Sequence, residues 1–279
     1  MAQQESIPRA QKQRAQTVDK ALHVLDAVAE SEEPITLTEL VAETGLEKTT
    51  THRLARSLAD GGLLRFDPET RSYTLGWRLI ELGALAAQRT RALSVADQYL
   101  NQLRDDTGET IHLGAYDNGE VVYLAQKSSS AAVVVRARIG QRRPLHSTAM
   151  GKVLLAFGPD EWLFKLLKEP ELKAYTENTI RDKEELQAHL RRVRRVGFAV
   201  DDEEMTQGIR CVAAPIMDYT GLAVAAISVT GPAFRVSRGE LDRLTTQVSA
   251  ASQDISSELG FSKGIAEQDK SDASGTKPE

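Results

Sequence analysis

Residues 35–75 constrain the fold of this chain more than any other stretch of its sequence. Thr36 and Glu39 form an S/T-x-x-E pattern, which satisfies unpaired amides at the start of a helix. Gly45 can end that helix in a left-handed conformation at little steric cost. A second helix is expected over 47–60, and a hairpin with strands at 63–66 and 72–75 follows. This order of elements predicts a winged helix-turn-helix.

The predicted second helix has a basic, hydroxyl-rich outer face. Its packed side is formed by residues three and four apart, Thr51, Leu54, Ala55 and Leu58. A helix in the major groove needs cations for phosphates and short polar side chains for base edges. We therefore expect DNA contacts from the helix and the hairpin at Lys48, Thr49, Thr50, His52, Arg53, Arg56, Arg65 and Arg71.

The alternative is that this tri-helical unit is only a packing module with solvated charges. Three consecutive threonines at 49–51 weaken a helix, a cost that is easier to explain if the hydroxyls contact DNA. Charge gives no general support, because the chain has a net charge of −5 and residues 1–79 hold 10 Lys and Arg against 12 Asp and Glu. The basic character is local, so we expect dimerisation to supply the remaining affinity for DNA.

The 279 residues suffice for two domains with cores of their own. No apolar run approaches the roughly 20 residues of a membrane span, and residues 1–14 lack the apolar core of a secretory signal. Cys211 is the only cysteine, which excludes an intramolecular disulfide. These features predict a cytoplasmic protein.

The chain is expected to contain two domains between polar tails. We predict a disordered basic tail at 1–16, a DNA-binding domain at 17–78, a linker helix at 79–93, a second domain at 94–260 and a disordered tail at 261–279. The first helix of the second domain is expected at about 94–106.

The second domain mixes strands and helices, so the predicted fold class is α+β with an antiparallel sheet. Asn118-Gly119 predicts a tight hairpin, because both residues tolerate positive φ. A final helix is expected to begin at Ser237 with a capping box to Glu240. The expected strands are 110–116, 120–125, 132–139, 198–200, 209–217 and 222–230, and the other helices are 149–157, 159–168 and 182–195.

Four motifs in this domain resemble the IclR family of bacterial transcriptional regulators. They are PLHSTAMGK at 144–152, GFAVDDEE at 197–204, GIRCVAAPI at 208–216 and AISVTGP at 226–232. With the N-terminal part, the resemblance covers residues 17–260. It implies a GAF-like domain that binds a small organic or aromatic acid, and heads that pair on a palindromic operator as a homodimer or a dimer of dimers. Many members are repressors and some are activators.

The resemblance also implies the residues of the effector pocket: Val135, Ala149, Met150, Asp201, Ile209, Cys211, Ser228 and Thr230, with His146 close in sequence. Their chemistry suits a small acid, because a helix that opens at Ala149 offers unpaired amides to a carboxylate. Ser228 and Thr230 lie two apart on a strand, so their hydroxyls share a face. Buried Ser, Thr and Cys can also serve only their local backbone, so each member remains an individual prediction.

Three other classes of protein compete with a regulator: an enzyme, a metal or redox sensor, and a pure interaction module, which operator footprinting would distinguish from a regulator. An enzyme is not expected, because the sequence has no G-x-S-x-G elbow and Gly151-Lys152-Val153 is not a phosphate loop. A metal site could form if Cys211, His146 and Asp201 met. A lone cysteine without a CxxC partner makes that site weak, so neither a metal nor a cofactor is expected. Metal or redox sensing through Cys211 stays as the alternative to effector binding.

Overall fold

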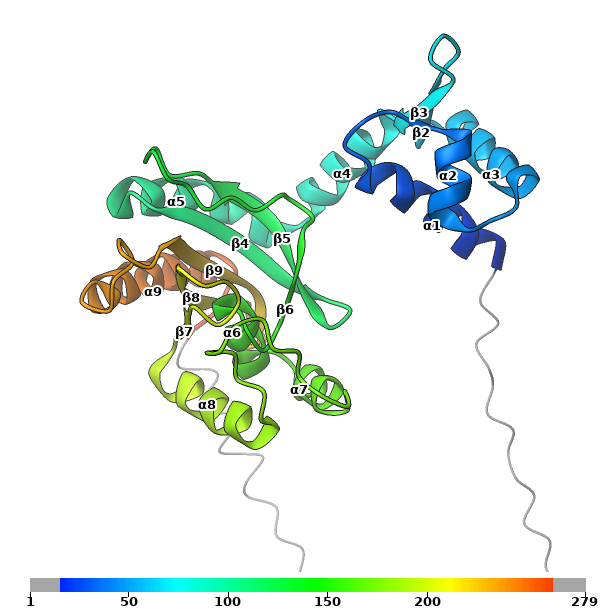
Figure 1. Ribbon diagram of the computed structural model, residues 1–279. Coiled ribbons are helices and arrows are strands. Elements are labelled where there is room, and N and C mark those ends of the chain that lie inside the picture. The colour runs from blue at the N-terminus through cyan, green and yellow to red at the C-terminus, as the bar shows by residue number, and fades with distance from the viewer. Residues whose placement is uncertain (1–15, 263–279) are drawn as a thin grey trace, which may run out of the picture. The chain divides into compact units, whose positions relative to one another are not determined.

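The computed structural model describes residues 16–262, and the chain divides between Arg89 and Thr90 into two compact units (Figure 1). The predicted disordered tails lie outside the described residues, apart from Gln16, Phe261 and Ser262. Among the helices between residues 16 and 262, none has the length and apolar character needed to cross a membrane. The first unit consists of α1 (Gln16–Glu30), β1 (Ile35–Thr36), α2 (Leu37–Thr44), α3 (Lys48–Asp60), β2 (Leu64–Asp67), β3 (Ser72–Leu75) and α4 (Arg78–Arg89).

The first unit is the predicted winged helix-turn-helix. The capping box of α2 is present: the Thr36 N–H donates to Glu39 Oε2 at 2.8 Å, and the Glu39 N–H donates to Thr36 Oγ1 at 3.4 Å. Gly45 ends α2 with φ of 65°, in the left-handed region. Apolar side chains of α1, α2, α3, β2 and β3 form one core, which holds α3 against the other helices.

The wing has one strand more than the predicted hairpin, because β1 pairs with β3 in a sheet of order β1-β3-β2. Ile35 lies opposite Tyr73, and Thr36 lies opposite Ser72. A strand of two residues is too short to display an alternating pattern, so β1 could not be predicted from periodicity.

The predicted linker helix at 79–93 is wrong at its end. Helix α4 stops at Arg89, and α5 (Arg91–Thr107) begins after Thr90 instead of at Ser94. Thr90 has an extended backbone, with φ of −89° and ψ of 91°, so it separates the two helices. No residue of α4 is buried in the described chain.

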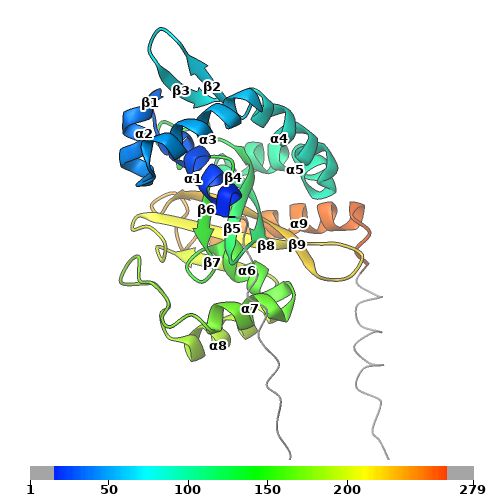
Figure 2. The same ribbon diagram turned by 90° about the vertical axis from the view of Figure 1, so that its right-hand side faces the viewer.

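The second unit confirms the predicted α+β class, with an antiparallel sheet of order β6-β5-β4-β9-β8-β7 (Figure 1). Helices α5 and α9, which lie side by side (Figure 2), pack with one set of strand residues, and α6 and α8 pack with the other. The remaining elements are β4 (Thr110–Asp117), β5 (Glu120–Lys127), β6 (Arg142–Pro144), α6 (Ala149–Phe157), α7 (Asp160–Leu167), α8 (Lys183–Val196), β7 (Ala199–Asp202), β8 (Ile209–Met217), β9 (Ala223–Pro232) and α9 (Leu241–Glu258).

The predicted strand at 132–139 does not form; the short strand β6 follows it at 142–144. Side chains hold this segment instead of a ladder: Gln126 Oε1 accepts the Ala137 N–H at 2.7 Å, and Arg235 donates to Val133 O at 2.8 Å. The valine-rich sequence of this segment therefore does not indicate a strand, because no neighbouring strand satisfies its backbone.

The predicted start of the last helix is also wrong. Residues 237–240 form a turn, and α9 begins at Leu241. The Glu240 carboxylate accepts a hydrogen bond from Arg243 Nε at 2.7 Å. That bond replaces the predicted capping box with Ser237.

Candidate functional site

The exposed face of α3 brings together most of the predicted DNA contacts on the helix. With 3.6 residues per turn, five side chains fall within an arc of about 140°. All five are exposed: Lys48, Thr49, His52, Arg53 and Arg56. The result is a contiguous surface of four nitrogen-bearing side chains, one lysine, one histidine and two arginines, beside the hydroxyl of Thr49.

The three consecutive threonines of α3 differ in their surroundings. Thr49 is exposed, Thr50 is half-buried at the margin of the packed side, and Thr51 is fully buried. The Thr51 hydroxyl donates to Glu47 O at 3.1 Å, one turn earlier. Thr51 therefore serves the helix itself, and Thr50 lies at the edge of the exposed face.

The wing carries the two other predicted arginines, both exposed. The guanidinium carbon of Arg65 lies 5.1 Å from the centroid of the Trp77 ring, within the range of a cation–π contact. Arg71 lies in the turn between β2 and β3 with φ of 53°, and Asp67 Oδ1 stabilises that turn by accepting the Glu69 N–H at 2.8 Å. The guanidinium of Arg65 thus lies against Trp77, and the backbone of Arg71 is part of a defined turn.

The second unit contains a cavity of about 270 Å³, which we call the sheet cavity. It opens between the sheet and the N-terminus of α6, and the segment 135–137 closes part of it. Eight of the nine predicted effector-binding residues line it: Val135, Ala149, Met150, Asp201, Ile209, Cys211, Ser228 and Thr230. The fold therefore gathers residues that are up to 95 positions apart in the chain.

The N-terminus of α6 offers donors to this cavity. Thr148 caps the helix: its hydroxyl accepts the Gly151 N–H at 3.1 Å and donates to Pro144 O at 2.8 Å. The first amides of a helix have no partner within it, so those of Ala149 and Met150 are available to a ligand. Gly151 is required here, because a Cβ at this position would collide with the backbone carbonyl of Leu145.

Strand register explains why the polar residues of the cavity lie together. Asp201 on β7 is opposite Cys211 on β8, which is opposite Thr230 on β9. Ser228 is opposite His112 on β4. Adjacent strands are about 4.8 Å apart, so a carboxylate, a thiol and a hydroxyl form a row across three strands.

Asp201 is the titratable group of this row. It is 3% exposed, and burial raises its pKa to about 7 although the neighbouring Lys152 acts in the opposite direction. Its Oδ1 atom accepts the N–H groups of Glu204 at 2.7 Å and Met205 at 3.3 Å. A ligand carboxylate would therefore meet a carboxyl group that changes charge near neutral pH.

A buried ion pair lies next to Asp201. Lys152 on α6 has no exposed surface; its Nζ donates to Val200 O at 2.6 Å and to the carboxylate of Glu204. Burial raises the pKa of Glu204, and Lys152 opposes that shift. Sequence reasoning missed this pair, since a lysine in an apolar helix reads as a surface residue.

Burial also raises the pKa of the Cys211 thiol, so the thiol stays protonated at neutral pH and is a poor metal ligand or nucleophile. Within residues 16–262, no group of three His, Cys, Asp or Glu side chains could hold a metal ion. The meeting of Cys211, His146 and Asp201 that a metal site would require does not occur.

His146 is the predicted pocket residue that the structure places elsewhere. It is buried, its Nε2 lies 2.9 Å from Lys173 O, and its ring packs 6.0 Å from that of Tyr175. The chain changes direction at Thr148, where α6 is capped, so closeness in sequence to Ala149 does not bring His146 into the sheet cavity.

Several lining residues were not predicted to bind the effector. They are His112, Tyr123, Arg136, Ala137, Arg143, Thr148, Met205 and Thr206. His112 could have been noticed as the polar residue of an otherwise apolar stretch, Ile-His-Leu. Tyr123 and Arg143 look like ordinary strand residues, and only the sheet order brings them to the cavity.

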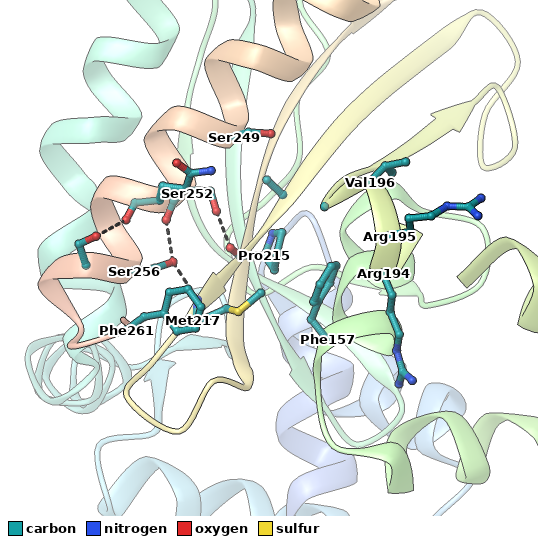
Figure 3. A pocket seen from close by; sticks show the side chains of 14 residues that line it. Phe157, Arg194, Arg195, Val196, Pro215, Met217, Ser249, Ser252, Ser256 and Phe261 are labelled. Atoms are coloured by element: carbon teal, nitrogen blue, oxygen red, sulfur yellow. Dashed lines mark hydrogen bonds between the residues drawn. The ribbon is translucent and has the colours of Figure 1, made fainter. Parts of the chain in front are cut away.

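A larger cavity of about 480 Å³ lies beside β8, between the ends of α8 and α9 (Figure 3). Its buried serines are engaged with the backbone of β8: Ser252 donates to Pro215 O, and Ser256 accepts the Met217 N–H at 3.0 Å. The guanidinium group of Arg194 points away from these serines (Figure 3). The serines thus satisfy backbone groups of β8 beyond the stretch that pairs with β7, and this cavity is less suited to a polar ligand than the sheet cavity.

Comparisons with known proteins agree across both units. Residues 84–257 match the family described as bacterial transcriptional regulator IclR C-terminal, and residues 17–68 match the IclR helix-turn-helix domain. The HTH-type transcriptional regulator KdgR of Dickeya chrysanthemi is 36% identical over 245 residues, which span 88% of this chain and 80% of that protein. The transcriptional repressor IclR of Escherichia coli (strain K12) is 30% identical over 249 residues, 88% of this chain and 91% of that protein. The crystal structure of the Thermotoga maritima IclR has a TM-score of 0.74 at 30% identity, covering 89% of this chain and 100% of that one.

Proposed function

The chain belongs to the IclR family of bacterial transcriptional regulators. From this premise we propose that it is a repressor and that a small organic or aromatic acid controls its binding to a palindromic operator. The family consists of DNA-binding regulators, not enzymes. The observation that carries the proposal is that one chain combines an exposed basic face on α3 with a cavity that holds a carboxyl group, a thiol and hydroxyls. We propose repression and not activation because the similar protein from E. coli is a repressor; an activator of the same architecture is the alternative.

In this proposal α3 enters the major groove. Arg53 and His52 reach base edges, Lys48 at the start of the helix and Arg56 nearer its C-terminus contact phosphates, and the wing arginine Arg71 contacts the flanking backbone. A guanidinium that reads guanine contributes about 1–3 kcal/mol of discrimination. The exposed arc on α3 supports these roles.

The test is DNA binding by an Arg53→Ala variant, measured by fluorescence anisotropy on the fragment upstream of the gene. We expect a loss of about tenfold or more in affinity, with the same affinity for the effector. Arg192→Ala, an exposed arginine on α8, is the matched control and should bind like the parent protein. Equal DNA affinity in the Arg53 variant and its control would contradict the proposal that α3 contacts DNA.

A homodimer is proposed because α4 exposes apolar side chains. Ile80, Leu82 and Leu85 are 63%, 48% and 49% exposed, and Leu82 and Leu85 share a helix face at i, i+3 spacing. Paired heads would lie about 34 Å apart on DNA, one helical turn. A Leu82→Glu/Leu85→Glu variant should be monomeric by light scattering. A variant that keeps the oligomeric state of the parent would refute α4 as the interface; the parent's mass would separate a dimer from a dimer of dimers.

The effector is proposed to bind in the sheet cavity. The amides of Ala149 and Met150 and the nearby Arg143 suit its carboxylate, and Ser228 and Thr230 suit its other polar groups. A thermal-shift screen of organic and aromatic acids should find binders, and these should release DNA. Ser228→Ala should weaken release and leave DNA binding without ligand intact. A release that is unchanged in this variant would place the effector elsewhere.

Redox sensing is the remaining alternative, and the protonated thiol of Cys211 speaks against it. Cys211→Ser should keep the response to the acid, and peroxide should affect DNA binding by this variant and by the parent protein equally. As a DNA-binding regulator, the protein is proposed to work in the cytoplasm.

A further inference from the structure

His112 lies at the floor of the sheet cavity and contacts three side chains. It is 1% exposed, in the middle of β4. Its Nδ1 lies 3.2 Å from Thr230 Oγ1, its Nε2 lies 3.2 Å from Gln126 Oε1, and its ring packs 4.9 Å from that of Tyr123. A neutral imidazole has one N–H and one lone pair, so the identity of the protonated nitrogen decides what Thr230 can do.

Gln126 determines which nitrogen of His112 is protonated. Its Oε1 accepts the backbone N–H of Ala137 at 2.7 Å, and its Nε2 donates to Ser128 Oγ at 2.8 Å. A backbone N–H can only donate, so the amide oxygen, not the amide nitrogen, faces both Ala137 and His112. His112 Nε2 must therefore carry the hydrogen that it shares with this oxygen, and Nδ1 must be the acceptor.

His112 is neutral because burial disfavours its charged form. Burial lowers its pKa to about 4, and the only opposing contribution comes from its hydrogen bond with Gln126. Its hydrogen-bond partners are an amide and a hydroxyl, with no carboxylate among them in the described part of the chain. At neutral pH its Nδ1 therefore carries a lone pair.

From this geometry we propose that His112 is a positioning residue that commits the Thr230 hydroxyl to donate to Nδ1, so that Thr230 presents only an acceptor to the cavity and selects effectors with a hydroxyl at this point. The proposal rests on the proposed effector function of the cavity. The ligand class is a hydroxy acid: the carboxylate takes the amide and arginine donors at one side, and a hydroxyl hydrogen bonds to Thr230 at the other. An oxo acid of the same shape would place an acceptor against an acceptor.

The same network holds part of the cavity wall. Gln126 binds Ala137, and the adjoining residues Val135 and Arg136 line the cavity with it. Thr230, His112, Gln126 and the 135–137 segment thus form one chain of hydrogen bonds from floor to wall. Loss of His112 should therefore alter ligand preference and leave the wall in place, because Gln126 keeps its own bond to Ala137.

The first test uses the unliganded full-length protein. Long-range ¹H–¹⁵N NMR of the imidazole should show His112 with a protonated Nε2 and an unprotonated Nδ1 throughout the neutral range. A His112→Phe spectrum assigns the signals by their absence. Protonation at Nδ1, or at both nitrogens at pH 7, would overturn the proposal whatever the ligand proves to be.

The second test compares hydroxy and oxo acids of matched shape, lactate with pyruvate and mandelate with phenylglyoxylate, by calorimetry. The parent protein should bind the hydroxy acid about tenfold more tightly, the effect of one unpaired buried polar contact. In His112→Phe and in Thr230→Val the hydroxy acid and the oxo acid should bind with about equal affinity. His189→Phe, in which a half-buried histidine on α8 outside the cavity is replaced, should keep the preference for the hydroxy acid.

The outcomes separate the two proposals. Tighter binding of the oxo acid than of the hydroxy acid, or a hydroxyl preference that persists in His112→Phe, would refute the role of His112. Either result would leave the proposed effector binding intact. Failure of all four acids to bind would count against the proposed effector class, while the NMR result would still decide the tautomer. If His112→Phe does not fold, Thr230→Val and the parent spectrum carry the test.

Discussion

The buried Lys152 gives the most demanding prediction. Replacement by methionine keeps the apolar stem in α6 and removes the charge that pairs with Glu204 and donates to Val200 O. Breaking one side of a buried ion pair costs about 3–5 kcal/mol, because the other charge stays behind. A stable fold therefore requires Glu204 to become neutral in this variant.

The cost depends on pH, with a sign set by Glu204. Burial raises the pKa of this carboxyl, and Lys152 counters the shift, so removing the lysine raises the folded-state pKa further. A group with a raised pKa holds its proton more tightly in the folded state, so stability is lost as pH rises above the unfolded pKa of about 4.3. Asp201 shifts in the same direction. We expect Lys152→Met to cost about 3–5 kcal/mol at pH 8. At pH 5 only the hydrogen bond to Val200 is missed, about 1–3 kcal/mol.

The two tryptophans allow a clean measurement, because Trp77 and Trp162 lie in different units. Trp162 stacks on Tyr116 with ring centroids 4.0 Å apart, so in a Trp77→Phe background its fluorescence reports unfolding of the second unit. Urea unfolding at pH 5 and 8 then gives the two losses, with exposed Lys165→Met as control. The reasoning would be refuted by equal losses at both pH values, or by a loss below about 1 kcal/mol at pH 8.

Three further predictions follow from single residues. Because the pKa of Asp201 is about 7, binding of a carboxylate effector should weaken as pH rises from 6 to 8, and Asp201→Asn should flatten that profile in calorimetry. Gly151→Ala should destabilise the second unit by about 1–3 kcal/mol, whereas Gly83→Ala, with open space around its Cβ, should be neutral or stabilising; thermal melts that rank them the other way would contradict the packing of α6. Thr36→Ala should cost about 1 kcal/mol through loss of the α2 cap, as urea unfolding followed at Trp77 would show.

The parts of the fold that depend on local chemistry could be predicted from the sequence. The cap at Thr36, the left-handed Gly45 and the Asn118-Gly119 turn, with φ of 52° and 98°, each need only neighbouring residues. Helix α6 was also located from its own apolar pattern. Seven of the eight predicted residues that line the cavity lie in the four motifs that resemble the family, and Val135 is the one outside them.

The parts that depend on distant partners could not be predicted. Residues 132–139 are rich in valine but lack a neighbouring strand, and their bonds come from Gln126 and Arg235. Lys152 is buried because Glu204 and Val200 O, about 50 residues later, meet it. His112 joins the cavity because β4 lies next to β9 in the sheet order. Pairings of this kind are fixed by the sheet as a whole and leave no periodic trace.

The central claim is that two α3 helices read a palindromic operator and that the sheet cavity controls them. DNase I footprinting of the upstream region, with and without the acid that binds most tightly, tests it directly. We predict two protected inverted half-sites about 10 base pairs apart, and loss of both together when the acid is added. A single unpaired footprint, or protection that the acid leaves unchanged at saturation, would contradict the claim.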